Sequence, residues 1–156
     1  MIRKLVTGGQ SGVDRSVLDF AVENAIPYGG WVPAGGWAED HPDAPGVLAL
    51  YKNLVETPSK NVQERTMLNV RDSDGSIVFL PSQNNEISPG TSYQIKVMQR
   101  LEKPYIIVSL ENPNIKEVTQ WIKKHKIQIL NIGGPRASEY PEGYKQAKEA
   151  LLKILL

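Results

Sequence analysis

Short apolar runs alternate with segments of helical periodicity along most of this 156-residue chain. The runs Ser76–Leu80 and Tyr105–Val108 are largely apolar, as strands buried on both faces of a parallel sheet tend to be. Between such runs, apolar residues recur at helical spacing, for example from Gly12 to Asn24, which is typical of an amphipathic helix. About five repeats of this alternation predict an α/β fold of three layers, with a mainly parallel sheet of about five or more strands.

The same pattern locates the individual elements, apart from one irregular segment. Pro33–Thr57 follows neither period, and a loop of this length is usually functional or contains unrecognised structure. Ser11 and Asp14 resemble a capping box, which predicts a helix start near Ser11. The predicted strands are residues 2–7, 28–32, 76–80, 105–108 and 127–132, and the predicted helices are residues 12–24, 59–70, about 91–103, about 112–126 and a last helix that contains Tyr144 and Ile154.

Composition excludes several classes of protein. The chain has no cysteine, which excludes disulfides, zinc–thiolate sites, iron–sulfur clusters and a thiol nucleophile. The 18 Lys and Arg against 17 Asp and Glu leave a formal net charge of +1, so we expect no nucleic-acid partner. No stretch resembles the ~20 apolar residues of a membrane span or the apolar core of a signal peptide. We therefore expect no membrane partner, and a single cytoplasmic domain over residues 1–156.

Three glycine-bearing loops follow predicted strands: Gly8–Gly12, Ser88–Thr91 and Gly133–Arg136. In a parallel sheet, loops that leave the carboxyl ends of strands gather on one edge, where ligands bind. Two of these loops lead into helix N-termini, whose free N–H groups favour anions. The arrangement predicts a cradle for a phosphorylated small ligand, although a tight turn before a capped helix explains the first loop as well.

Four side chains could complete such a site. Arg15 lies in a first helical turn, where a cation opposes the helix dipole, so its presence suggests an anionic partner. Arg65 and Asn69 are four residues apart and share a helix face. Arg136 follows a glycine turn at a strand end, and its guanidinium matches phosphate oxygens. Arg65 and Arg136 could equally be ordinary surface residues.

Other familiar sites are disfavoured. The first loop has neither the dinucleotide fingerprint nor the P-loop pattern, since no lysine follows it. Glu39, Asp40, His41 and Asp43 could hold Mg²⁺ through water, but a solvated loop explains the cluster better, so no metal site is predicted. The chain also lacks the Gly-x-Ser-x-Gly motif of an α/β-hydrolase.

The chain resembles the family of molybdenum cofactor carrier proteins, and through it the Rossmann-like domains that include the lysine-decarboxylase-like phosphoribohydrolases. The resemblance implies a Rossmann-like ligand-binding domain. It covers nearly the whole chain in the expected order. The segments that carry it are Gly8–Arg15, Pro27–Pro33, Ala38–Asp40, Glu64–Thr66, Asn69–Gly75, Pro89–Thr91 and Leu130–Arg136.

The resemblance implies a homo-oligomeric carrier, a dimer or tetramer, that holds a phosphorylated pterin–molybdenum cofactor or a nucleotide-like ligand at the glycine loops. Val32 stands where many relatives have cysteine, so no directly ligated metal is expected. By the same resemblance, a first phosphate loop would consist of Gly9, Gln10, Ser11, Gly12 and Arg15, and a second of Gly90 and Thr91, with Gly134 and Arg136 facing them.

Two alternatives to a carrier remain open. The first is an enzyme of the nucleotide phosphoribohydrolase type, although Gln94 follows the second loop where the phosphoribohydrolase pattern has glutamates. The second is a sensor module in which a nucleotide-like ligand controls assembly. The final segment carries five leucine or isoleucine residues from Leu151 to Leu156, more than one buried helix face needs, and this favours an oligomer.

Overall fold

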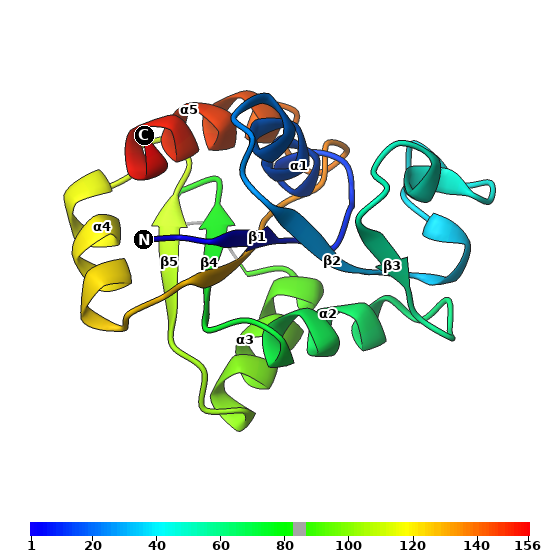
Figure 1. Cartoon of the computed structure of the whole chain (residues 1–156), viewed down its shortest axis with the longest axis horizontal. Helices are drawn as coiled ribbons and strands as arrows, with labels where there is room; N and C mark the ends of the chain where they lie inside the picture. Colours follow the sequence, from blue (N-terminus) through cyan, green and yellow to red (C-terminus); the bar gives the residue numbers. More distant parts are fainter. Residues whose placement is uncertain (83–86) are drawn as a thin grey trace.

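Strands and helices alternate along the chain in the computed structural model, which describes residues 1–82 and 87–156 (Figure 1). The strands of the described part are β1 (Lys4–Val6), β2 (Tyr28–Val32), β3 (Leu54–Glu56), β4 (Gly75–Leu80), β5 (Tyr105–Ser109) and β6 (Ile129–Gly133). Its helices are α1 (Val13–Glu23), α2 (Val62–Arg71), α3 (Pro89–Arg100), α4 (Ile115–Lys124) and α5 (Gly143–Leu155), with short 3₁₀ helices η1 (Ala34–Gly36) and η2 (Gly46–Ala49).

The six strands form one parallel sheet in the order β3-β2-β1-β6-β4-β5. The last strand in the sequence therefore lies near the middle of the sheet. In its register, Leu130 is opposite Leu5 of β1 and Ile132 is opposite Ile77 of β4. The order reverses between β1 and β4, and β6 fills the position between them.

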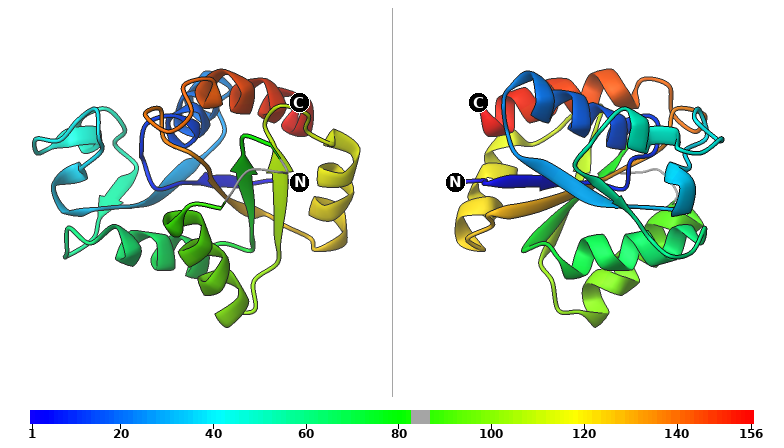
Figure 2. Two further views of the ribbon diagram at one scale, coloured as in Figure 1. Left: turned by 180° about the vertical axis from the view of Figure 1, so that it is seen from behind. Right: turned by 45° about the vertical axis from the view of Figure 1, so that its right-hand side comes forward.

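Helices cover both faces of the sheet (Figure 2). On one face, α1, α4 and α5 pack over a core that includes Ile77 and Phe79. On the other, α2 and α3 pack over a core that includes Val78. Consecutive residues of β4 thus face opposite layers, and all six of its residues are buried. This arrangement confirms the predicted three-layer, Rossmann-like α/β fold with a mainly parallel sheet.

Polar side chains define where most of the helices begin. Asn61, Ser88 and Asn114 are the N-caps of α2, α3 and α4, and each side chain accepts a backbone N–H of the first turn. The predicted capping box of α1 is wrong. The N-cap of α1 is Gly12, without a side-chain cap, because the Ser11 hydroxyl is hydrogen-bonded elsewhere.

The irregular segment Pro33–Thr57 contains η1, η2 and the edge strand β3, which the sequence pattern did not predict. A small core beneath it joins Val32 and Leu54 to Leu18 of α1. In β3 only Leu54 is buried, while Val55 and Glu56 are exposed. A three-residue strand with one buried side chain is too short to show a period of two.

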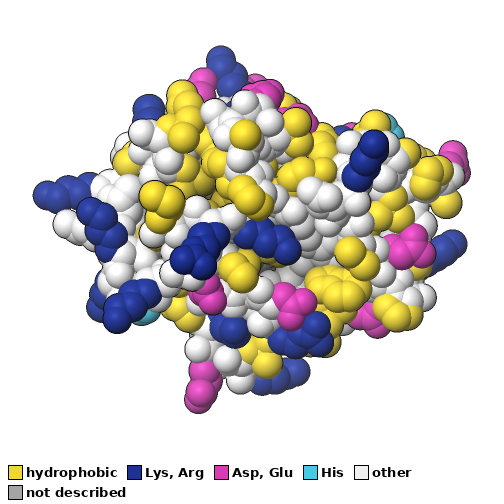
Figure 3. All heavy atoms as spheres, viewed as in Figure 1, with side chains coloured by type: hydrophobic (Ala, Val, Ile, Leu, Met, Phe, Trp, Pro, Cys, Tyr) yellow, Lys and Arg dark blue, Asp and Glu magenta, His cyan; other side chains and the backbone are white. Residues whose placement is uncertain are grey.

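Surface charge is mixed on the face shown in Figure 3, where Lys and Arg side chains project from several places and Asp and Glu side chains lie between them. Among residues 1–82 and 87–156, no helix is long and apolar enough to cross a membrane. The predicted absence of a nucleic-acid partner is not tested by the structure and stays a prediction.

Candidate functional site

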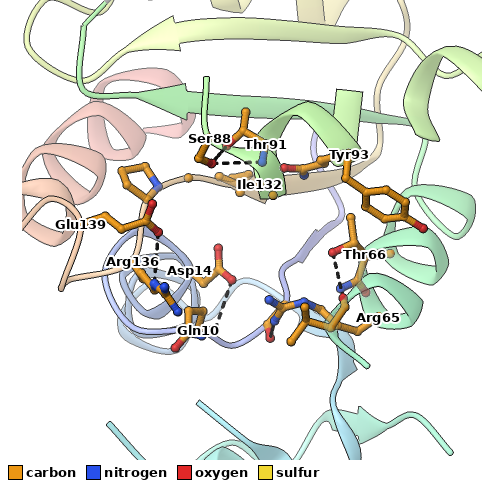
Figure 4. A pocket seen from close by; sticks show the side chains of 18 of the residues that line it. Gln10, Asp14, Arg65, Thr66, Ser88, Thr91, Tyr93, Ile132, Arg136 and Glu139 are labelled. Atoms are coloured by element: carbon orange, nitrogen blue, oxygen red, sulfur yellow. Dashed lines mark hydrogen bonds and ion pairs between the residues drawn. The ribbon is translucent and has the colours of Figure 1, made fainter. Parts of the chain in front are cut away.

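A cavity of about 730 Å³ opens at the carboxyl ends of the three neighbouring strands β1, β6 and β4 (Figure 4). Its walls come from the loops after β1 and β6, from α2 and from the first half of α3. Ligands of open α/β sheets bind at this edge, where the strand order reverses. The volume lies in the range of small-molecule sites, about 300–1,000 Å³.

The cavity brings together seven of the eleven side chains and glycines predicted for the site. The other four, Gly9, Ser11, Gly12 and Arg15, are not among its lining residues. Their binding role is not tested by the structure and stays a prediction. The seven that line the cavity are Gln10, Arg65, Asn69, Gly90, Thr91, Gly134 and Arg136.

The start of α1 is covered by the loop that follows β6. The Val13 N–H donates to the Pro135 carbonyl at 3.3 Å, and the Ser11 hydroxyl accepts the Ala137 N–H at 3.0 Å. A Cβ atom built on Gly12 would lie 2.6 Å from the Pro135 oxygen, and Gly12 has a φ of +77°, so only glycine fits there. This helix N-terminus is therefore used within the protein.

Arg15 forms a two-pronged ion pair with Asp40. Its Nη1 and Nη2 donate to the two carboxylate oxygens at 2.8 and 2.9 Å. The hydrogen bonds from Arg15 lower the pKa of the Asp40 carboxyl below its ordinary value. The pair fastens the segment after η1 to α1.

The N-terminus of α3 borders the cavity, and residues 1–82 and 87–156 place no loop across it comparable to the one that covers α1. The Ser88 hydroxyl accepts the Thr91 N–H at 3.2 Å, and Pro89 occupies the first turn. A Cβ atom built on Gly90 would meet no atom within 4 Å. Of the two helix starts predicted to hold phosphate, this one has no described residue within 4 Å of the position a Gly90 Cβ would take.

Two residues of α2 reach the cavity in different ways. Nη1 of Arg65 donates to the Gly8 carbonyl at 2.5 Å, and burial lowers the pKa of this guanidinium. Asn69 uses both ends of its amide on the backbone of Trp31 on β2, accepting its N–H at 2.7 Å and donating to its carbonyl at 3.0 Å. Arg65 thus adds positive charge to the wall, and Asn69 holds β2 against α2.

Arg136 lies at the rim with acidic neighbours. Its Nε is 3.2 Å from Glu139 and 3.6 Å from Glu39, and its side chain is about half exposed. Burial acts to raise the pKa of Glu39, but hydrogen bonds from Ser11 and Ser138 outweigh it, so the net pKa is lowered. Glu39 therefore ties the irregular segment to the loops after β1 and β6.

Asp14 is a cavity residue that the sequence interpretation assigned to helix capping. Its side chain is almost fully buried, and Oδ2 accepts the Gln10 N–H at 3.1 Å. Burial raises the pKa of the carboxyl, while the charge of Arg65 and the Gln10 hydrogen bond oppose that rise. A buried carboxyl with a perturbed pKa in a cleft is a typical functional group. The position of Asp14 just after the Gly8–Gly12 loop is the sequence feature that could have indicated a role in the cavity.

The acidic cluster of the irregular segment is divided in the structure. Glu39 is hydrogen-bonded to Ser11 and Ser138, and Asp40 to Arg15. In the described part of the chain, no group of three or more His, Asp or Glu side chains could hold a metal ion. The carboxylates of this cluster instead stabilise the loops around the cavity.

The fold and the cavity define a Rossmann-like α/β domain with a cavity at the carboxyl edge of its sheet. The model of the circularly permutated YpsA SLOG family matches residues 5–155, and the chain belongs to this family. A solved structure with a TM-score of 0.87, the putative molybdenum carrier protein from Syntrophus aciditrophicus SB, is 36% identical. The alignment covers 99% of this chain and 96% of that one. No curated protein matches the chain.

Proposed function

We propose that this protein is a carrier that binds a phosphorylated small molecule, a pterin-type molybdenum cofactor or a nucleotide-like ligand, in the cavity at the carboxyl edge of the sheet. The observation that carries the proposal is the N-terminus of α3 at the wall of a cavity of about 730 Å³, where no described residue lies within 4 Å of a Cβ built on Gly90. N–H groups at a helix start and the positive end of its dipole favour a phosphate.

Cations on other walls of the cavity support an anionic ligand. Arg65 and Arg136 line it from α2 and from the loop after β6. Positive charge therefore faces the cavity from three separate elements: α2, the loop after β6 and the N-terminus of α3. A nucleotide or a pterin phosphate is of a suitable size for this volume.

The structural relative supports the molybdenum cofactor as one candidate, since its name describes a molybdenum carrier. The residues present fit the organic part of such a cofactor: the Gly90–Thr91 turn could hold its phosphate, and Asp14 could contact its ring. The metal centre supplies redox chemistry to whichever enzyme receives it. This chain would bind the phosphate and orient the ring.

The second candidate, a nucleotide phosphoribohydrolase, is favoured by Asp14. Cleavage of a bond between a base and a sugar benefits from a carboxyl group that can transfer a proton. Asp14 lies at the cavity wall, and its pKa is raised by burial. Release of free base from a nucleotide by the purified protein would establish this activity.

The carrier proposal can be tested at Gly90, where the absence of neighbours permits a matched pair of substitutions. The purified protein is mixed with GMP, AMP, a pterin phosphate, inorganic phosphate and molybdate, and its melting temperature is measured. A ligand at 100 times its Kd stabilises a fold by about 2.7 kcal/mol, about 5–11 °C in a domain of this length. We expect Gly90→Ala to keep the shift and Gly90→Glu to abolish it, since a carboxylate at the start of α3 repels phosphate.

Equal shifts in the two Gly90 variants would place the ligand elsewhere. No shift with any compound would contradict a phosphate-dependent carrier. The same samples, incubated with the nucleotides and assayed for free base, separate the carrier from the hydrolase.

A further inference from the structure

The carboxyl group of Asp14 is only partly used by the protein. Its Oδ2 accepts the Gln10 N–H at 3.1 Å. Its neighbour Thr7 is fully buried, and a hydrogen bond from the Thr7 side chain acts to lower the pKa of the Asp14 carboxyl. The nearest cation on α2, Arg65, donates to the Gly8 carbonyl. A carboxylate has about four acceptor positions, so the Asp14 carboxyl can still accept hydrogen bonds from a ligand.

That capacity faces the cavity. Figure 4 shows the carboxyl of Asp14 pointing inward, with one oxygen hydrogen-bonded to Gln10. Ser88 and Thr91, at the start of α3, lie on the opposite wall. Asp14 is 7% exposed, so what exposure remains lies within the cavity that it lines. The two walls therefore have opposite polarity, one suited to an anion and the other to hydrogen-bond donors.

A ligand that satisfies both walls carries a phosphate at one end and N–H donors at the other. Trp37 and Tyr93 also line the cavity and offer aromatic surface to a planar ring. A ring with an N–H and an adjacent amino group can donate two hydrogen bonds to one carboxylate. Guanine and pterin both carry this edge, whereas adenine presents a ring acceptor in the same place.

We propose that Asp14 is a ligand-binding residue that accepts hydrogen bonds from the amino–amide edge of a guanine- or pterin-like ring whose phosphate lies at the start of α3. This inference rests on the proposed function and adds the class of ring. Because the carboxylate is buried, a ring that lacks these donors leaves it unsatisfied, and this penalty makes the site selective.

The test compares GMP, IMP and AMP, which share the sugar phosphate and differ in the ring edge. IMP lacks the 2-amino group of GMP, and AMP replaces the ring N–H with an acceptor. We expect GMP to bind wild-type protein about tenfold more tightly than IMP, with AMP the weakest, as measured by calorimetry. In Asp14→Asn, the amide oxygen can still accept from Gln10, and its NH₂ then opposes the donors of the ring. The preference for GMP should fall below about twofold.

Asp43→Asn is the matched control, because Asp43 is exposed and lies on the irregular segment outside the cavity lining. It should keep the full preference. Circular dichroism and the melting temperature of Asp14→Asn establish that the variant is folded. Equal affinities of wild type for the three nucleotides, or an unchanged preference in Asp14→Asn, would overturn the inference.

The two proposals fail in different ways. If the nucleotides bind without discrimination and Gly90→Glu still abolishes binding, the phosphate site stands and the role of Asp14 is wrong. If Gly90→Glu has no effect on nucleotide binding, the phosphate site itself is wrong. The inference about the ring then fails with it.

Discussion

The side-chain amide of Asn69 hydrogen-bonds both backbone groups of Trp31, its Oδ1 to the N–H at 2.7 Å and its Nδ2 to the carbonyl at 3.0 Å. Asn69 lies on α2 and is almost fully buried, and Trp31 lies on β2. One side chain thus supplies the backbone pairing that a neighbouring strand would otherwise provide. The contact joins a wall of the cavity to the outer half of the sheet.

Substitution of Asn69 by alanine should therefore destabilise the protein. It leaves the N–H and carbonyl of Trp31 without these partners, and an unsatisfied backbone group costs about 1–3 kcal/mol. Urea unfolding should show a loss of that size. Asn53→Ala, at an exposed position, is the control and should change stability by less than about 0.5 kcal/mol. A loss at Asn69 no larger than the control would contradict the structural role.

Arg15 and Asp40 should be coupled in stability. Their two-pronged pair is partly shielded, with the Arg15 side chain 12% exposed and the Asp40 side chain 42% exposed. Partly exposed pairs contribute about 0.2–1 kcal/mol, and a double-mutant cycle of Arg15→Ala and Asp40→Ala should give a coupling free energy near the upper end. Additive effects in the cycle would show that the pair contributes nothing.

The same Arg15→Ala variant tests the prediction that Arg15 binds the ligand. Because Arg15 lies outside the cavity lining, we expect the ligand-induced melting shift to persist in it. Arg136→Ala, which changes a lining residue, should reduce that shift. The opposite ranking would favour the first glycine loop as the anion site.

Asp14 should make stability depend on pH in an unusual direction. Burial raises the pKa of Asp14 above its ordinary value of 3.8, so the folded state holds this proton more tightly than the unfolded state. Well below pH 3.8 the Asp14 carboxyl is protonated in both the folded and the unfolded state, so it does not lower the free energy of unfolding. As the pH rises through 3.8 toward the folded pKa, the unfolded state ionises first, and stability falls.

Asp14→Asn removes this titration. The variant should therefore melt above the wild type at neutral pH, and the difference should shrink as the pH falls toward 3.8. One kcal/mol corresponds to about 2–4 °C in a domain of this length. A variant that melts below the wild type at every pH would show that the carboxylate is stabilised in the fold.

Tyr51 and Tyr144 should ionise at higher pH than ordinary tyrosines in an alkaline titration. Both hydroxyls donate to the carboxylate of Asp19, and burial together with these hydrogen bonds raises the pKa of each above 10.0. Stability should therefore fall as the pH rises above 10, where tyrosines of the unfolded chain ionise. Ultraviolet titration of wild type should show late-ionising tyrosine, reduced by one residue in Tyr51→Phe. Tyr93→Phe, which lies away from Asp19, should leave the late phase intact.

Much of the fold could be predicted because buried faces of helices and strands require apolar residues at regular spacing in the sequence. All six residues of β4 are buried, and such a strand reads as an apolar run. Leu54 is the one buried residue of β3, and it leaves no pattern. The position of β6 between β1 and β4 depends on long-range pairing, which local periodicity does not contain.

The site was predictable to the extent that glycine and helix starts mark it. Gly90, Thr91 and Gly134 line the cavity as strand-end loops should. The sequence could not show that the Arg15 side chain pairs with Asp40 and does not line the cavity, because Asp40 lies 25 residues away in a segment without periodicity. Asp14 was read as a cap because a local hydrogen bond explains an acidic first turn as well as a buried cavity does.

The central place of β6 has a consequence for synthesis of the chain. Until Ile129–Gly133 leave the ribosome, β1 and β4 cannot acquire the neighbour that joins them, and each presents an open edge. Between the synthesis of Ser109 and that of Ile129, the strands already made can pair only as two separate half-sheets, β3-β2-β1 and β4-β5. Unpaired strand edges favour pairing with other chains, so the late synthesis of β6 extends the period in which the nascent chain is exposed to mispairing.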